Sequence, residues 1–340
     1  MQMMRILLIA LALLFSVNAQ AKDISILTWK IEKLGATGRG ETPGYGAKNL
    51  GLRSDLDLEY IAGFIREILK ADIVAIQDIA VSRVVEGVPV SDPLNKIVEH
   101  LGPGWRSTLA ASGDGAGAIT LGYLWNSNNV RGLKFHEMPV PRGRIAGAPL
   151  FDQVPMVGYF EAIGIRDESA NDFVLVNVQL TPGEENVDNH LIAMVELRSQ
   201  LDSVLQSIDV REQDRVILGN FNDNPYRTTD KGKPVYPATL YQYMDFHGYR
   251  NYVTDEFRST RMDSELSEVL DHVLVNSQAE KHVIGDKKAV PWMPLGGVAE
   301  LPEWRRTYSD HFPVRIKLRV SYDDDADFQP PQPDAADLRQ

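Results

Sequence analysis

The sequence predicts an α/β fold in which helices pack on the outside of β-sheets. Short runs rich in β-branched and aliphatic residues alternate with longer runs of helical periodicity in both halves of the 340-residue chain. The sequence also has no internal repeat. This alternation is typical of sheets covered by helices.

The first half of the chain begins with a β-rich run at residues 24–29. A glycine-rich segment follows at 35–51, which we expect to be a long surface loop. Residues 56–70 then place apolar side chains three and four positions apart, which predicts a helix. The other predicted elements of this half are strands at 72–77, 105–110 and 118–125 and a helix at 93–101.

The second half contains one long predicted helix at residues 186–208, whose length and periodicity exceed those of the other segments. Short apolar runs before and after it predict strands. These strands cover residues 173–180, 215–219, 269–275 and 312–318.

The two ends of the chain differ from the body, residues 22–320, which we expect to be one domain. Arg5 precedes an apolar run, and a small-x-small sequence ends at Ala21, so residues 1–21 resemble a secretory signal peptide. The apolar run is shorter than the ~20 residues that span a bilayer. Residues 321–340 are acidic and proline-rich, as in disordered tails. We therefore expect a periplasmic or secreted protein without a membrane span.

Composition and charge exclude two kinds of chemistry. The chain has no cysteine, so disulfides and thiolate metal ligands are absent. Its formal net charge of −12 disfavours bulk binding of polyanions, because nucleic-acid affinity depends on neutralising phosphates with Lys and Arg. Phosphate chemistry would need a metal ion or a local basic patch. Residues 131–144, with Arg142 and Arg144, are a candidate phosphate-binding patch, and a solvated loop is the alternative.

Several predicted strands end in polar residues that core packing does not explain. Ligands gather where rigid strands finish, so these residues are candidates for a binding or catalytic site. Taken singly, an Asn or Asp after a strand caps a turn, and an Asp-His pair forms a surface hydrogen bond. Together they form an ordered series: Lys30, Asp78, Gln179, Asn220, Asn222, Asp271, Asp310 and His311.

The motifs that carry these residues are LTWK, VAIQD, NVQL, GNFN, DHVLV and SDHFPV. In this order they resemble the motif series of the endonuclease/exonuclease/phosphatase superfamily, over residues 24–318. The resemblance implies the DNase I-like fold, a four-layer α/β sandwich with two central, mainly antiparallel sheets flanked by helices and a site at their common edge. It also implies hydrolysis of phosphodiesters or phosphomonoesters by water and a divalent ion, Mg²⁺ or Mn²⁺.

Four positions match the motifs of the superfamily. By this resemblance Asp310 is a carboxylate that serves the metal, and His311 contacts the phosphate. Asp271 is the acid that orients the histidine. Asn222 is the asparagine whose amide helps to hold the phosphate and the nucleophile.

Other positions depart from the pattern. Lys30 stands in place of an asparagine, and Asp78 in place of the glutamate that is the principal metal ligand. Gln179 replaces a histidine. Asn220 replaces the aspartate that orients or deprotonates the attacking water. Gln153 occupies a position that is often arginine in related sequences, which makes it a possible phosphate contact.

These departures predict a weakened catalytic centre. An amide at position 220 supplies neither a proton acceptor nor a negative charge, and general-base catalysis is commonly worth about 10²–10⁴-fold. Asp78 is one methylene shorter than glutamate, whereas Mg²⁺ needs oxygen at about 2.0–2.1 Å. For Lys30 we consider two positions, an internal ion pair with Asp78 that replaces the charge of the cation, or an outward position that contacts phosphate.

Two functions follow from these observations. The first is an exported DNase I-like phosphodiesterase, most plausibly a nuclease, with strongly reduced activity. The alternative is a catalytically inactive member of the superfamily that binds a phosphate-bearing ligand or a protein partner through the same cleft. DNA, RNA, phospholipid headgroups and inositol phosphates all stay open as ligands, as does the oligomeric state.

Overall fold

Two six-stranded sheets form the centre of the structure, a computed structural model. It describes residues 23–36, 52–111, 115–139, 144–145, 148–163, 169–183, 186–226, 239–254, 259–262, 268–285, 288–293 and 301–320. The expected signal peptide at 1–21, the expected tail at 321–340, most of the 35–51 loop and Arg142 lie outside these ranges. The side chain of Arg144 is also outside the description.

The first sheet has the strand order β15-β16-β1-β2-β6-β5. Its neighbours run antiparallel except β1 and β2, which are parallel. The strands are β1 (Asp23–Leu34), β2 (Ile73–Ala80), β5 (Trp105–Leu109), β6 (Ile119–Asn126), β15 (Val290–Pro291) and β16 (Val314–Arg319).

The second sheet repeats this plan with the order β13-β14-β12-β11-β10-β7, in which only β11 and β12 are parallel. Its strands are β7 (Val130–Glu137), β10 (Phe151–Ile163), β11 (Ser169–Leu180), β12 (Arg215–Asn220), β13 (Tyr249–Asn251) and β14 (Asp271–Asn276). Two small hairpins pair β3 (Arg83–Val85) with β4 (Val88–Val90) and β8 (Arg144–Ile145) with β9 (Ala148–Pro149).

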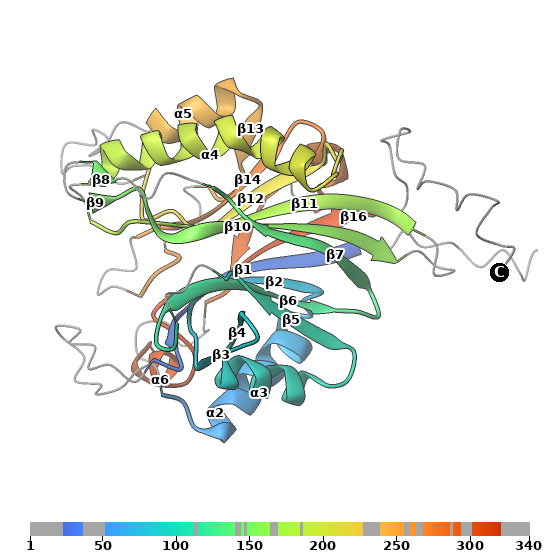
Figure 1. Cartoon of the computed structure of the whole chain (residues 1–340), viewed down its shortest axis with the longest axis vertical. Helices are drawn as coiled ribbons and strands as arrows, with labels where there is room; N and C mark the ends of the chain where they lie inside the picture. Colours follow the sequence, from blue (N-terminus) through green and yellow to red (C-terminus); the bar gives the residue numbers. More distant parts are fainter. Residues whose placement is uncertain are drawn as a thin grey trace, which may run out of the picture.

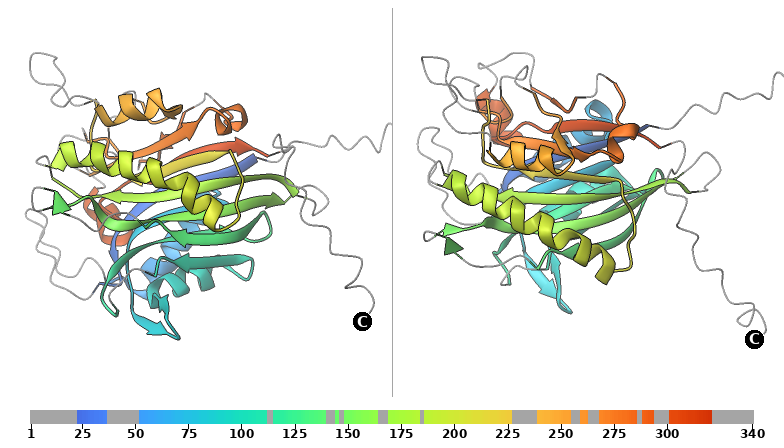
Figure 2. Two further views of the ribbon diagram at one scale, coloured as in Figure 1. Left: turned by 45° about the horizontal axis from the view of Figure 1, so that its top comes forward. Right: turned by 90° about the horizontal axis from the view of Figure 1, so that it is seen from above.

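Helices cover the outer face of each sheet and complete four layers (Figures 1 and 2). On the first sheet these are α2 (Asp55–Gly63), its π-helical continuation η1 (Phe64–Ile68) and α3 (Asp92–Leu101). On the second sheet they are α4 (Val187–Ser207) and α5 (Thr239–Phe246). The remaining helices are η3 (Ala279–His282) and α6 (Leu301–Thr307). The predicted four-layer α/β sandwich is confirmed.

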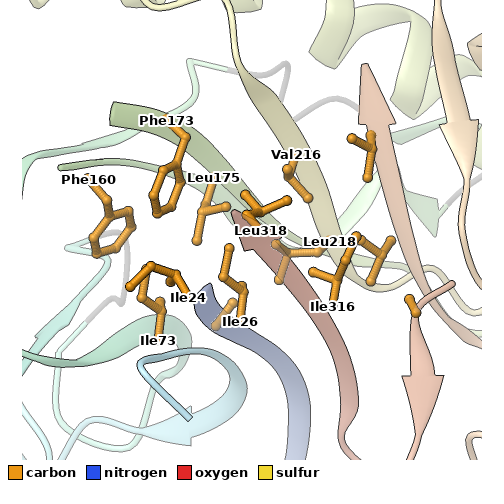
Figure 3. Packing of buried hydrophobic residues seen from close by; sticks show 14 of the residues in the cluster. Ile24, Ile26, Ile73, Phe160, Phe173, Leu175, Val216, Leu218, Ile316 and Leu318 are labelled. Atoms are coloured by element: carbon orange, nitrogen blue, oxygen red, sulfur yellow. The ribbon is translucent and has the colours of Figure 1, made fainter. Parts of the chain in front are cut away.

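The hydrophobic core lies between the two sheets. Ile24 and Ile26 of β1 pack there against side chains of the second sheet, such as Val216 and Leu218 (Figure 3). The alternate side chains of β1, including Leu27 and Trp29, pack instead with those of α2 and α3. Strand periodicity thus assigns even-numbered positions of β1 to the space between the sheets.

Sequence periodicity missed β7 and β10, and residues 131–144, for which a solvated loop was the alternative, begin in a strand. The first part of that segment is strand β7. Its Arg131 is paired with Glu161 at 2.6 Å, and the Lys134 ammonium donates to the backbone carbonyl of Asp209 at 2.9 Å. These two cations are engaged within the second sheet and near the end of α4, whereas the phosphate-binding role predicted for Arg142 and Arg144 stays a prediction.

No helix in the described part of the chain is long and apolar enough to cross a membrane.

Candidate active site

Along the strands of both sheets, the side chains of the inner face change from apolar in the core to polar at one end of the sheet. On β12, Leu218 packs between the sheets, so Asn220 two residues later lies on the same face. On β1 the same alternation places Ile26, Thr28 and Lys30 on one face of the strand. The polar ends of the strands therefore meet where the core between the sheets finishes.

Register aligns the candidate residues of the second sheet. Gln179 on β11 lies opposite Asn220 on β12, and Asn220 lies opposite Asp271 on β14. On the other side of β11, Gln153 of β10 is the register partner of Gln179. The four side chains form one row across four neighbouring strands, although their positions in the sequence span more than a hundred residues.

A layer of buried amides separates this row from the apolar core. Gln77 Nε2 donates to Asn177 Oδ1 at 2.7 Å and to Thr28 Oγ1 at 3.0 Å. Asn177 Nδ2 in turn donates to backbone carbonyls of both β2 and β6. Sequence reasoning missed this layer. The only signal for it was an amide two positions before Gln179 in an otherwise apolar strand.

Asp78 is surrounded by N–H donors. Its Oδ1 accepts hydrogen bonds from Gln153 Nε2 at 2.6 Å and from Gln179 Nε2 at 3.0 Å. Its Oδ2 lies 3.8 Å from the ammonium of Lys30. The backbone of Asp78 is left-handed, with φ of 65°, at a break in the pairing of β2 with β6. This conformation is uncommon for a residue other than glycine and re-aims the side chain.

Lys30 occupies the internal position rather than the outward one, because its side chain is 15% exposed and that of Asp78 is 8% exposed. The pKa of Lys30 lies above its ordinary value. Burial is the largest influence and lowers it, but four carboxylates raise it by more in sum. In decreasing order of effect these are Asp78, Asp310, Asp271 and Asp152. Lys30 is therefore a permanent positive charge among acids.

His311 and Asp271 form a buried pair. His311 Nδ1 lies 2.7 Å from Asp271 Oδ2, and the two side chains are 1% and 2% exposed. The other carboxylate oxygen, Oδ1, accepts a hydrogen bond from Asn220 Nδ2 at 3.2 Å. In a hydrogen bond to a carboxylate oxygen the imidazole donates from Nδ1, which leaves Nε2 as its second ring nitrogen. Asn220 Oδ1 is buried and has no hydrogen-bond partner.

Asp310 is held next to the end of β1 by its neighbour Ser309. Ser309 Oγ donates to the backbone carbonyl of Lys30 at 2.6 Å and accepts from the His311 N–H at 3.1 Å. Burial, the largest influence, raises the pKa of Asp310, but attraction to His311, Lys30 and two arginines leaves it below its ordinary value. Ser309 was not among the predicted site residues, although it lies within the SDH motif.

Two further candidates support the site rather than line it. Asn222, with φ of 49°, donates from Nδ2 to the backbone carbonyl of Leu180 at 2.6 Å, which ties the loop after β12 to the end of β11. Gln153 is 5% exposed and its amide is directed to Asp78. In both residues the amide nitrogen donates its hydrogen bond to another group of the protein.

The donor set does not fit the divalent ion that the fold implies. A hard cation needs several oxygen lone pairs around it. Around Asp78 the neighbouring groups are instead two amide N–H donors and an ammonium. Within the described ranges, no three His, Cys, Asp or Glu side chains are placed to hold a metal ion together. What remains is a hydrogen-bonded polar centre, in which an ammonium faces Asp78, beside an oriented imidazole.

Comparisons with known proteins give matches only at the level of structure. No family model matches the chain, and no curated protein sequence matches it. The human Nocturnin catalytic domain has a TM-score of 0.54 at 13% identity, over 88% of this chain and 96% of that one. An endonuclease/exonuclease/phosphatase family protein from Bacteroides thetaiotaomicron has a TM-score of 0.55 at 13% identity, over 88% and 98%.

ANGEL2, a 2′,3′-cyclic phosphatase solved with adenosine-2′,3′-vanadate, has a TM-score of 0.56 at 14% identity, over 88% of this chain and 96% of that one. The chain has the fold of the endonuclease/exonuclease/phosphatase superfamily. The resemblance seen in six short motifs is therefore confirmed for the DNase I-like fold. At these identities the likeness extends to the architecture, and the chemistry of the site depends on the residues described above.

Proposed function

We propose that this DNase I-like protein binds a phosphate-bearing ligand at the polar ends of its central strands and that its metal-dependent phosphodiester hydrolysis is strongly reduced. The proposal depends on one observation: the Asp78 carboxylate already accepts hydrogen bonds from Gln153 and Gln179 and forms an ion pair with Lys30. A carboxylate that accepts two hydrogen bonds and faces an ammonium has lost most of its capacity to coordinate a cation.

The loss of a base at position 220 acts in the same direction. Asn220 donates to Asp271 and to the backbone carbonyl of Leu270, so its amide serves the neighbouring strand. An amide takes up no proton near neutral pH, and a missing general base lowers rates by about 10²–10⁴-fold. Reduced hydrolysis therefore follows even if a cation binds elsewhere.

Ligand binding is supported by groups suited to an anion. The Lys30 ammonium faces Asp78, but its side chain keeps 15% of its surface exposed, and His311 is held in one orientation by Asp271. The fold neighbours include a 2′,3′-cyclic phosphatase and a mannosyl-6-phosphatase, both named for phosphate esters. A phosphodiester or phosphomonoester, a nucleic-acid end included, is the ligand class that this combination favours.

A hydrolysis assay tests the first half of the proposal. Plasmid DNA and a small chromogenic phosphodiester are incubated with Mg²⁺, Mn²⁺ or EDTA. The wild type is compared with a quadruple variant that restores the superfamily pattern: Lys30→Asn, Asp78→Glu, Gln179→His and Asn220→Asp. We expect EDTA-sensitive cleavage by the variant and a rate at least about 10²-fold lower for the wild type. EDTA-sensitive cleavage by the wild type at the same rate would show the proposal to be wrong.

A binding assay tests the second half separately. Inorganic phosphate is titrated into the wild type in EDTA, with the ³¹P NMR line width and the melting temperature as readouts. We expect saturable binding that Lys30→Gln weakens by about tenfold, since an ammonium–phosphate contact of this kind is worth on the order of 1–3 kcal/mol. Lys96, an exposed lysine paired with Glu99 on α3, gives the control variant Lys96→Gln. Equal weakening by both variants would indicate bulk electrostatics only.

We also propose that the protein is exported, on the strength of the signal-like residues 1–21. N-terminal sequencing of the protein from a periplasmic or culture fraction should begin after Ala21. Full-length chain confined to the cytoplasmic fraction would contradict export.

A further inference from the structure

The ammonium of Lys30 lies among the carboxylates of the site. The charge of Lys30 acts on four aspartates, of which Asp271 is also hydrogen-bonded to His311. The ammonium lies 3.8 Å from Asp78 Oδ2, beyond hydrogen-bonding distance but close enough for a strong attraction in a buried setting. The Lys30 ammonium thus offsets part of a negative charge that would otherwise attract cations from solution.

The position of Lys30 is fixed by backbone contacts as well as by charge. Its strand pairs in register with β2 at Gln77, the residue before Asp78. Its carbonyl accepts the hydroxyl of Ser309, which anchors the segment that carries Asp310. Lys30 is therefore built into the junction of the two segments that supply these aspartates, so it is not a side chain that reaches in from a distant loop.

Two buried oxygen atoms on neighbouring strands of the second sheet have no hydrogen-bond donor. They are Gln179 Oε1 and Asn220 Oδ1, in side chains that are 2% and 0% exposed. The two residues are register partners on the parallel strands β11 and β12, and both continue the inner-face alternation of their strands. Unpartnered buried acceptors are rare in folded proteins and point to a group that is missing.

We propose that Lys30 is a built-in cation that keeps divalent metal ions out of this site, and that a neutral side chain at position 30 converts the site into a divalent cation site. An ion bound to Asp78 Oδ2 at about 2.1 Å would lie at most about 6 Å from the Lys30 ammonium. At that separation two positive charges in a partly buried site repel each other strongly.

Removal of the ammonium would leave carboxylate and amide oxygens of the kind that a hard cation takes as ligands. Asp78 Oδ2 and the Asp310 carboxylate would supply negative charge, and the two unpartnered amide oxygens would supply neutral ligands. The effect of Lys30 on metal binding concerns the protein without a phosphate-bearing ligand. The inference therefore does not depend on the ligand proposed above, and either proposal can fail alone.

Thermal unfolding with increasing Mn²⁺ or Mg²⁺ tests the inference, because a ligand that binds only the native state raises the melting temperature. The variants are Lys30→Met, which keeps the length of the side chain, and Lys30→Gln, which keeps a polar end. We expect no concentration-dependent rise for the wild type and a clear rise for both variants. The Kd for Mn²⁺ fitted for the variants should be at least about tenfold below the lower limit that the wild-type titration sets.

Two controls assign the effect. The double variant Lys30→Met/Asp78→Asn should lose the Mn²⁺ response, because the carboxylate that binds the ion is gone. Lys96→Met removes a positive charge of the same kind from the exposed surface of α3 and should behave like the wild type.

The inference is overturned by a wild type that already shows a saturable rise abolished by Asp78→Asn. It is also overturned if both Lys30 variants are folded and show no rise. A Lys30 variant that folds only in the presence of Mn²⁺ supports it, whereas variants that stay unfolded with and without Mn²⁺ overturn it, since the ion should replace the lysine as a counter-charge.

Discussion

His311 Nδ1 lies 2.7 Å from Asp271 Oδ2, and both side chains are buried. The two members of this pair lie on segments that lead into different sheets. His311 precedes β16, whereas Asp271 begins β14. The hydrogen bond therefore joins the two halves of the sandwich at the site and does more than orient an imidazole.

Replacing Asp271 should destabilise the fold as well as the site. Asp271→Asn removes a charge-assisted hydrogen bond to His311, worth about 1.5–3 kcal/mol of the free energy of unfolding. Urea unfolding measures this difference. Asp245→Asn, at an exposed position of α5, is the matched control and should change the free energy of unfolding by less than about 0.5 kcal/mol. Equal unfolding midpoints for the two variants would contradict the structural role of the pair.

Asn220→Asp should be destabilising by itself and sensitive to pH. The amide that now donates to Asp271 Oδ1 at 3.2 Å becomes a second carboxylate in a buried position. Repulsion between two adjacent carboxylates raises the pKa of one of them in the folded protein. At a pH above the ordinary carboxyl pKa the folded state is therefore destabilised, whereas at a pH where the group is protonated it is not. We expect a loss of about 1–3 kcal/mol at pH 8 that shrinks at pH 5. Asn128→Asp, at an exposed turn, provides the comparison and should show no such pH dependence.

The contribution of Lys30 should be confined to a window of pH. The raised pKa of Lys30 means that its stabilisation is complete below 10.5, the ordinary value, and is lost as pH rises through the higher folded value. The lowered pKa of Asp310 means that its stabilisation is present above its ordinary value of 3.8 and is lost as pH falls through the lower folded value. We therefore expect Lys30→Met to be less stable than the wild type by about 1–3 kcal/mol between roughly pH 4 and pH 10.

Unfolding curves at pH 3, 7 and 11 check this window. Outside it, the difference between Lys30→Met and the wild type should decrease. A difference that is the same at all three pH values would assign the effect of Lys30 to packing of its aliphatic stem.

Two consecutive arginines of α6 offer a comparison of buried with exposed ion pairs. Arg305 Nε lies 3.1 Å from both carboxylate oxygens of Glu32, and the pair is buried. Arg306 is 57% exposed and pairs with Glu303 and Asp57. Arg305→Met should lower the free energy of unfolding by about 3–5 kcal/mol, because Glu32 is left charged and buried. Arg306→Met should cost less than about 1 kcal/mol. Similar costs for the two variants, measured by urea unfolding, would contradict this assignment.

The order of strands and helices could be predicted from the sequence because periodicity is a local property. The predicted strand at 215–219 corresponds to β12 and the predicted helix at 186–208 to α4. Strands β7 and β10 escaped prediction. In β10, glycine and proline interrupt the apolar pattern within the strand, and β7 mixes charged and apolar residues at an edge of the sheet.

The sequence by itself determined that polar residues end the central strands and that position 220 has no titratable group. Both are statements about residue type, and no coordinates are needed to make them. Only the tertiary structure decided what those residues do. Gln153 and Gln179 donate to Asp78 across separations of 75 and 101 residues, and Lys30 meets the same carboxylate from another strand. No local pattern encodes such partners, because sheet register and the packing of two sheets determine which strand ends meet.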